Sequence, residues 1–131
     1  MSAISEMNEA ASTYIEHEHA VQLELLHALI EALRERRDAQ QVTELLLQLT
    51  LYCEAHFMSE ELIMRQNSFA DYEEHVDDHS QMLDRLAQIA TEHAAGNAAL
   101  EDSKAREALA FIETHIGARD QSYADFMRAR A

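Results

Sequence analysis

The 131-residue sequence contains no proline and no tryptophan, only two glycines and a single cysteine. Without proline and with so little glycine, the usual interruptions of helices are missing, and helix is favoured throughout. The lone Cys53 excludes an intramolecular disulfide, and the start MSAISEMNEAAS lacks the basic residues and apolar run of a signal peptide. No apolar run approaches the roughly 20 residues that span a bilayer. We therefore expect a soluble, cytoplasmic, helical protein.

Basic residues are also scarce. The chain has 10 Lys and Arg against 25 Asp and Glu, which gives a formal net charge of −15 at pH 7. Such a surface is repelled by phosphate backbones and by anionic lipid, so we expect neither nucleic acid nor membrane as a partner. The simplest role of this acidic surface is solubility.

Four segments have apolar residues at helical spacing: about 12–36, 39–65, 69–94 and 102–127. Ser68-x-x-Asp71 has the pattern of a capping box that opens the third segment, and Gly96-Asn97 is the strongest stop signal. The connections are short and the length suits one core. These features predict one domain over residues 1–131, an all-α, antiparallel, up-down-up-down four-helix bundle.

Two pairs of potential metal ligands flank the middle turn. His56-x-x-x-Glu60 precedes it and His75-x-x-x-His79 follows it. Residues four apart lie on one side of a helix, so each pair points two ligands in one direction. Near the two ends of the chain, His19, His115 and Asp120 add to this set. Five imidazoles and two carboxylates are enough ligands for two metal ions.

The positions of these residues can be compared with the predicted topology. In antiparallel helices, residues equally far from a tight turn lie at the same height. His56 and His79 are equidistant from the turn at 67–68, as are Glu60 and His75. His19 pairs with His56 about the break at 37–38, and His79 pairs with His115 about Asn97. All seven candidates are therefore predicted to meet at one level, where their burial without a metal would cost several kcal/mol each.

The ligand types restrict the metal. Histidine and carboxylate without thiolate suit iron, manganese or zinc, and seven ligands are too many for one tetrahedral zinc. A ferritin-like site needs Glu-x-x-His on two helices, whereas here Glu16-x-x-His19 and Glu24-x-x-His27 share one helix. The spacing of His115 and Asp120 is unusual, since five residues turn them away from a common direction. Either the helix is distorted there or the aspartate reaches round.

These residues in this order resemble a bacterial hemerythrin over nearly the whole chain. The resemblance rests on His19, His56-Phe57-x-x-Glu60-Glu61-x-x-Met64, His75-x-x-x-His79 and His115-Ile116-x-x-x-Asp120-x-x-Tyr123. It implies two non-heme iron ions with a bridging oxo or hydroxo group. By this resemblance, His75, His79 and His115 hold one iron, His19 and His56 hold the other, and Glu60 and Asp120 bridge both.

The function that the resemblance implies is reversible binding of dioxygen for carriage, storage or delivery. Dioxygen would bind at the iron with two histidines, in an apolar pocket formed by Phe57, Ile112 and Ile116. Two alternatives remain open. One is a sensor of oxygen, nitric oxide or redox state acting through a protein partner. The other is an enzyme that reduces peroxide or nitric oxide, for which Tyr123 is the one candidate proton donor. The leading expectation remains a binding protein that is not an enzyme.

The sequence departs from the family pattern near its start. It has no tryptophan, and residues 15–19 read IEHEH where Ile-Asp-x-Gln-His is usual. His17 is therefore a rival of His19, but a rotation of about 200° between them predicts that His17 faces solvent if His19 faces the metals. We expect His27 to be a hydrogen-bonded packing residue and Cys53 a small buried apolar group, with a redox role as the alternative. His93 is placed where a histidine suits a helix C-terminus.

Overall fold

The computed structural model describes the backbone of residues 3–129 and the side chains of residue 13 and residues 16–129. Residues 1, 2, 130 and 131 of the expected domain lie outside this range. The elements are α1 (Ala3–Arg34), α2 (Ala39–Gln66), α3 (Tyr72–Ala95), α4 (Ala98–His115), a π-helical turn η1 (Ile116–Asp120) and α5 (Gln121–Ala129). Between residues 3 and 129 there is no β-strand. None of the helices in this range combines the length and apolarity that a membrane-spanning segment needs.

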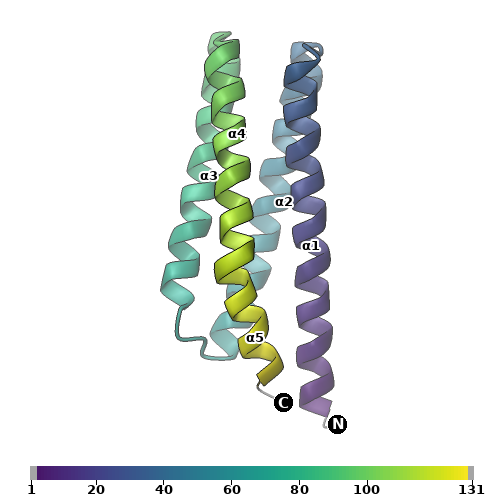
Figure 1. The fold of residues 1–131 in the computed structure, drawn as a ribbon, viewed down its shortest axis with the longest axis vertical. Coiled ribbons are helices and arrows are strands. Elements are labelled where there is room, and N and C mark those ends of the chain that lie inside the picture. The colour runs from purple at the N-terminus through teal and green to yellow at the C-terminus, as the bar shows by residue number, and fades with distance from the viewer. Residues whose placement is uncertain (1–2, 130–131) are drawn as a thin grey trace.

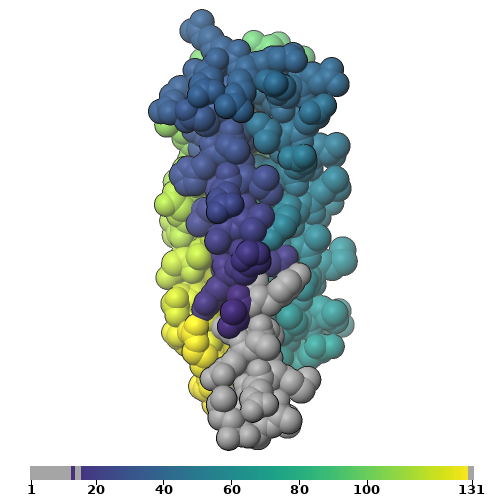
Figure 2. Space-filling view, turned by 90° about the vertical axis from the view of Figure 1, so that its right-hand side faces the viewer, coloured from purple at the N-terminus to yellow at the C-terminus, as the bar shows by residue number. Residues whose placement is uncertain are grey.

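The helices form an antiparallel up-down-up-down bundle, as the sequence predicts (Figure 1). α1 and α2 lie side by side, α3 and α4 form the other pair, and α5 continues the line of α4 beyond η1. Both ends of the chain lie at the same end of the bundle. Figure 2 shows the face centred on α1, with α2 on one side and the segment from α4 to α5 on the other.

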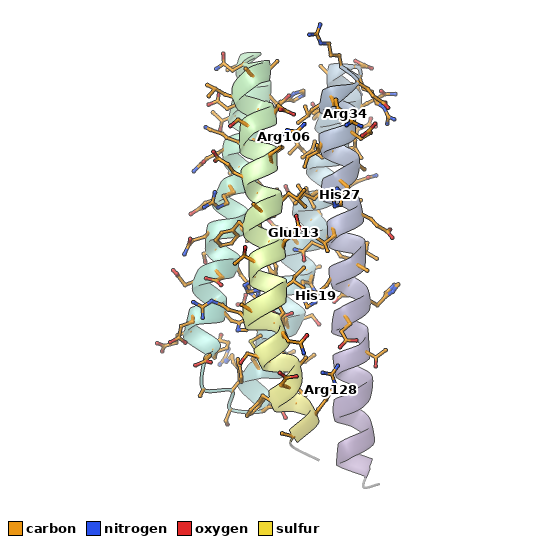
Figure 3. All side chains as sticks on the ribbon, in the orientation of Figure 1. His19, His27, Arg34, Arg106, Glu113 and Arg128 are labelled. Atoms are coloured by element: carbon orange, nitrogen blue, oxygen red, sulfur yellow. The ribbon has the colours of Figure 1, made fainter. Side chains whose placement is uncertain are left out.

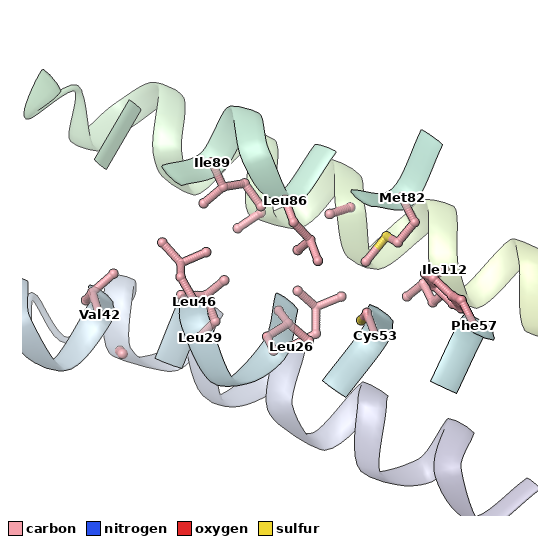
Figure 4. Close-up of a cluster of buried hydrophobic side chains, with 14 residues drawn as sticks. Leu26, Leu29, Val42, Leu46, Cys53, Phe57, Met82, Leu86, Ile89 and Ile112 are labelled. Atoms are coloured by element: carbon pink, nitrogen blue, oxygen red, sulfur yellow. The ribbon is translucent and has the colours of Figure 1, made fainter. Parts of the chain in front are cut away.

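The apolar core fills the half of the bundle farther from the termini. Its buried side chains come from all four long helices (Figure 4): Leu26, Leu29 and Ala32 of α1, Val42, Leu46, Leu49, Cys53 and Phe57 of α2, Met82, Leu86 and Ile89 of α3, and Ala105, Ala108 and Ile112 of α4. A second, smaller cluster near the termini contains Met64, Phe69, Tyr123 and Met127. The space between the two clusters is where the predicted ligands lie.

The predicted capping box at Ser68 is wrong. The third helix begins at Tyr72, three residues later than expected, and Asp71 occupies its N-cap without a side-chain hydrogen bond. Ser68 has a positive φ of 54° and belongs to the turn after α2. The turn is closed instead by the amide of Phe69, which donates to the carbonyl of Met64. Burial of the Phe69 ring in the second cluster offers a physical reason for this turn, because it fixes the chain before the helix begins.

The predicted stop at Gly96 is confirmed. Gly96 caps α3 in the left-handed conformation, with φ of 75°. Glycine alone adopts this conformation without a steric cost, and it is the usual residue at helix C-termini.

Replacing Gly96 with alanine should lower the free energy of unfolding by about 1 kcal/mol, because the new Cβ is strained at a positive φ. Gly117 provides a matched control, since it lies in a helical turn, its Cβ would meet no atom within 4 Å, and its φ is not positive. Gly117→Ala should be neutral or slightly stabilising. Urea unfolding of both variants measures the difference, and equal effects at the two positions would refute this account of the cap.

Candidate metal centre

All seven predicted ligands are buried and converge between the two apolar clusters. His19 comes from α1, His56 and Glu60 from α2, His75 and His79 from α3, His115 from the end of α4, and Asp120 from the end of η1. Figure 3 shows His19 about halfway along the bundle. The ligand atoms form two groups, and within each group all atoms lie within 4.8 Å of one another. One group is Glu60, His79, His115 and Asp120, and the other is His19, His56 and Glu60. The seven side chains therefore meet at one height in the bundle, as the positions of the turns predict.

Each carboxylate divides its two oxygens between two sets of imidazoles. Oε1 of Glu60 lies 3.2 Å from Nε2 of His79 and 3.8 Å from Nε2 of His75. Oδ1 of Asp120 lies 2.9 Å from Nε2 of both His75 and His115. The three-histidine set therefore faces one oxygen of each carboxylate.

The other two oxygens face the remaining imidazoles. Oε2 of Glu60 lies 3.2 Å from Nε2 of His19 and 3.3 Å from Nε2 of His56. Oδ2 of Asp120 lies 2.9 Å from Nε2 of His19. Glu60 and Asp120 thus lie between a three-histidine side and a two-histidine side, which is the geometry of two bridging carboxylates.

The π-helical turn resolves the spacing of His115 and Asp120. In a regular α-helix, residues five apart point in directions about 140° apart. In the π-helical turn η1 the hydrogen bonds join residues five apart, so each turn holds about one more residue than in an α-helix. Asp120 therefore points to nearly the same side as His115, five residues earlier. Of the two explanations that the sequence left open, the structure shows the distorted helix.

Three further carboxylates, which sequence reasoning did not assign to the site, lie within hydrogen-bond distance of the Nδ1 atoms of three ligand histidines. Glu18 lies 3.0 Å from Nδ1 of His56, and Glu61 lies 2.7 Å from Nδ1 of His79. Asp78 lies 2.9 Å from Nδ1 of His115. An Nδ1–H that donates to a carboxylate leaves Nε2 unprotonated and free to bind a metal. Each of these acids is the sequence neighbour of a predicted ligand, and this adjacency is the one signal in the sequence that could have identified them.

Only some of the buried polar atoms of the site are hydrogen-bonded to one another. Nε2 of His56, His79 and His115, together with Oε1 of Glu60, lack a hydrogen-bond partner despite being close to opposite charges. Buried polar atoms without partners cost free energy and normally indicate a missing ligand, ion or water. Nitrogen and oxygen donors that meet in this way fit a pair of divalent transition-metal ions. The donor set therefore fits two metal ions.

The electrostatics of the site reflect the same concentration of charge. Burial lowers the pKa of His19, but contacts with Asp120 and Glu60 outweigh it and raise that pKa to about 9. The pKa values of His56 and His115 are also raised, because their carboxylate partners outweigh burial. Burial opposes ionisation of Glu60 and Asp120, yet the surrounding imidazoles hold the pKa values of both carboxyls well below their usual range.

The other histidines are distributed as follows. His17 is exposed, as predicted from its rotation relative to His19. His27 is exposed too, so its interpretation as a packing residue is wrong: it lies one position beyond the buried Leu26 and is turned out of the core. His93, near the end of α3, joins three helices, with Nδ1 2.7 Å from Glu101 and Nε2 2.9 Å from the carbonyl oxygen of Ala39.

Cys53 is fully buried one turn before His56, and the amide of Gln22 lies 3.1 Å from its sulfur as a donor. Burial raises the pKa of the thiol to about 11, so at neutral pH it is protonated and a poor nucleophile. The packing interpretation is the one that the structure favours.

We therefore expect no reaction of the folded protein with the thiol reagent DTNB at pH 7.5, and one thiol per chain after unfolding in guanidinium chloride. The absorbance of the released thiolate measures both. Rapid labelling of the folded chain would contradict burial of Cys53.

The three residues predicted to form an apolar pocket lie beside the ligands. Phe57 is 3% exposed, and its ring stacks on His79 with centroids 4.0 Å apart and planes 6° apart. Ile112 is buried one turn before His115, and Ile116, which opens η1, is half-buried against the main core. These residues place apolar surface at the core side of the metal level.

Comparison with protein families agrees with this site. The family model described as Hemerythrin, "Hemerythrin HHE cation binding domain", matches residues 10–126. Comparison with the curated proteins and with the solved structures gave no match. The matched range contains all seven converging side chains and covers most of the 131 residues. With its buried histidine and carboxylate cluster and its helical bundle, the chain belongs to the hemerythrin family of cation-binding domains.

Proposed function

We propose that this protein is a non-heme di-iron protein that binds dioxygen reversibly. The observation that carries the proposal is the division of the Glu60 and Asp120 oxygens between three imidazoles on one side and two on the other. In this assignment His75, His79 and His115 hold one ion, and His19 and His56 hold the second. Iron at these positions would supply the electrons and the coordination site that dioxygen needs.

The two sides differ in the number of protein ligands. The three-histidine side provides three imidazole nitrogens and two carboxylate oxygens, whereas the two-histidine side provides two of each. The side of His19 and His56 is therefore one protein ligand short of the other. A small ligand is expected there, because an incomplete ligand set is what distinguishes a reactive metal site from a closed one.

The protein around the site would control water and protons. The main core closes one side of the ligand level and the Met64, Phe69, Tyr123 and Met127 cluster closes the other. Phe57, Ile112 and Ile116 would exclude water from the bound gas, which slows irreversible oxidation. Glu18 and Glu61 orient His56 and His79, so that the ligand nitrogens do not have to reorganise.

The test is oxygenation of the iron-loaded chain. Protein reconstituted with ferrous iron under anaerobic conditions should be nearly colourless, gain a visible absorption band when oxygen is admitted, and lose it when oxygen is removed. Immediate conversion to a stable ferric form would contradict reversible binding and would favour sensing or catalysis.

Two measurements separate this function from those alternatives. Steady consumption of peroxide or nitric oxide with a reductant, faster than slow autoxidation, would indicate an enzyme. A partner captured only in the presence of oxygen or nitric oxide would indicate a sensor.

Tyr123 is buried, its hydroxyl has no hydrogen-bond partner, and its pKa is raised by burial and by Glu60. Those features disfavour Tyr123 as the proton donor that the enzyme alternative would need.

A further inference from the structure

The outer face of α2 carries a row of exposed apolar side chains. Leu47, Leu51, Met58 and Leu62 are 55–72% exposed, and the only other exposed large apolar residue among the described side chains is Leu100 on α4. At 100° per residue, these four positions fall within a sector of about 60°. We call them the outer row. An ordered apolar row on a soluble surface indicates a contact surface more than four scattered exposed residues would.

The outer row is self-complementary when read in opposite directions. Leu51 and Met58 are equidistant from the midpoint between Glu54 and Ala55, and Leu47 and Leu62 are equidistant from the same midpoint. Two antiparallel copies of α2 crossing there would pair Leu51 with Met58 and Leu47 with Leu62, each pair twice. A twofold interface needs this property, because one patch must fit itself.

Charge follows the same symmetry. Glu44 and Arg65 are both exposed, lie in the same angular sector as the outer row, and are also equidistant from that midpoint. In the antiparallel arrangement, Glu44 of each copy faces Arg65 of the other. Opposite charges would thus close both ends of an apolar contact about 32 Å long. Parallel pairing would instead place Glu44 beside Glu44 and Arg65 beside Arg65.

We propose that α2 is the interface of a homodimer in which a second copy of this chain packs antiparallel on the outer row. The site described above does not depend on this contact, so the dimer is independent of the proposed function. Glu54, the acidic group at the midpoint, lies about 50° from the centre of the outer row, so the Glu54 carboxylates of both copies stay at one edge of the contact, in solvent.

Two grooves between α2 and α3 provide room for the second copy. One, of about 550 Å³, is lined by Leu46, Leu47, Ala90 and Ala94, among others. The other, of about 360 Å³, is lined by Phe57, Met58, His79 and Leu83, among others. In the antiparallel arrangement, the first groove lies at the height of Leu62 of the second copy, and the second groove lies at the height of its Leu51. The dimer would therefore also cover the side of the bundle next to Phe57 and His79.

Sedimentation equilibrium of the full 131-residue chain, loaded with iron, tests the proposal first. A reversible monomer–dimer equilibrium is expected. Met58→Glu should raise the dimer dissociation constant roughly a hundredfold, because each copy then buries an unpaired charge. Leu100→Glu, which introduces the same charge at an exposed apolar position outside the outer row, should leave the constant unchanged. A wild-type chain that is monomeric at all concentrations, or a dimer indifferent to Met58→Glu, would overturn the proposal.

A charge exchange tests the antiparallel alignment. Glu44→Arg alone and Arg65→Glu alone should each weaken the dimer about tenfold, because like charges then meet at both ends. The double variant should recover the dimer. An equimolar mixture of the two single variants should also recover it, since every facing pair in the mixed dimer is again opposite. Circular dichroism checks that all variants fold. Failure of the mixture to associate would overturn this alignment and with it the proposed interface.

Discussion

Replacing Glu60 with glutamine should leave the helices intact but prevent the site from holding two metal ions. Glu60 is fully buried, and its two oxygens face opposite sides of the site. Glutamine keeps the size of the side chain but loses the negative charge, and its amide nitrogen donates instead of accepting. The variant should retain at most one tightly bound ion per chain, as measured by elemental analysis after gel filtration.

His27→Gln is the matched control for this change, because His27 is exposed on α1 and lies away from the site. It should bind the same number of ions as the wild-type chain. Two tightly bound ions in the Glu60→Gln variant would show that Glu60 is not a bridge.

Removing the metal should make the stability of the protein depend on pH between about 6.5 and 9. In the metal-free chain, the pKa of His19 is raised from 6.5 to about 9 by Asp120 and Glu60, which outweigh burial. Below pH 6.5 this histidine is protonated in both the folded and unfolded chains, and its stabilising contacts are fully present. As the pH rises through 9 the folded chain loses the proton, and about 3 kcal/mol of the free energy of unfolding is lost.

The two carboxylates act at the other end of the pH range. Their pKa values are lowered in the folded chain, so their contribution is present above the ordinary carboxyl range and is lost as the pH falls below it. The metal-free chain should therefore be most stable between about pH 4.5 and 6.5. Urea unfolding at pH 5.5, 7.5 and 9 measures this.

The metal-loaded chain serves as the control, because imidazoles that bind a metal through Nε2 carry no proton there to lose. Loading at pH 7 should release protons. A metal-free chain that is more stable at pH 9 than at pH 6 would contradict the raised histidine pKa values.

Much of the site could be predicted because, in a four-helix bundle, the number of residues between a side chain and the nearest turn sets its height along the bundle axis. The equal distances of His56 and His79 from one turn, and of His79 and His115 from another, required only straight helices and short connections. The division of Glu60 and Asp120 between two sets of imidazoles did not follow from spacing, because it depends on side-chain rotamers. The resemblance to hemerythrins implies that assignment.

The errors have local physical causes. Ser68-x-x-Asp71 matches a capping pattern, but burial of Phe69 determines the turn and delays the helix to Tyr72. His27 lies next to the core residue Leu26, where a small difference in rotation decides between packing and exposure. The π-helical turn before Asp120 has no signature in a single sequence beyond the unusual five-residue spacing. The contacts of Glu18, Glu61 and Asp78 with the histidines could not be predicted from the sequence, because acidic residues are common in this chain and few of them lie at the site.

The number of iron ions that the chain binds tests the central claim most directly. Ferrous iron is titrated into the metal-free chain without oxygen, and bound iron is determined per chain at the equivalence point. Two sides of a site bridged by Glu60 and Asp120 predict two tightly bound ions per chain. An equivalence point at one ion, or no tight binding at all, would contradict the di-metal site.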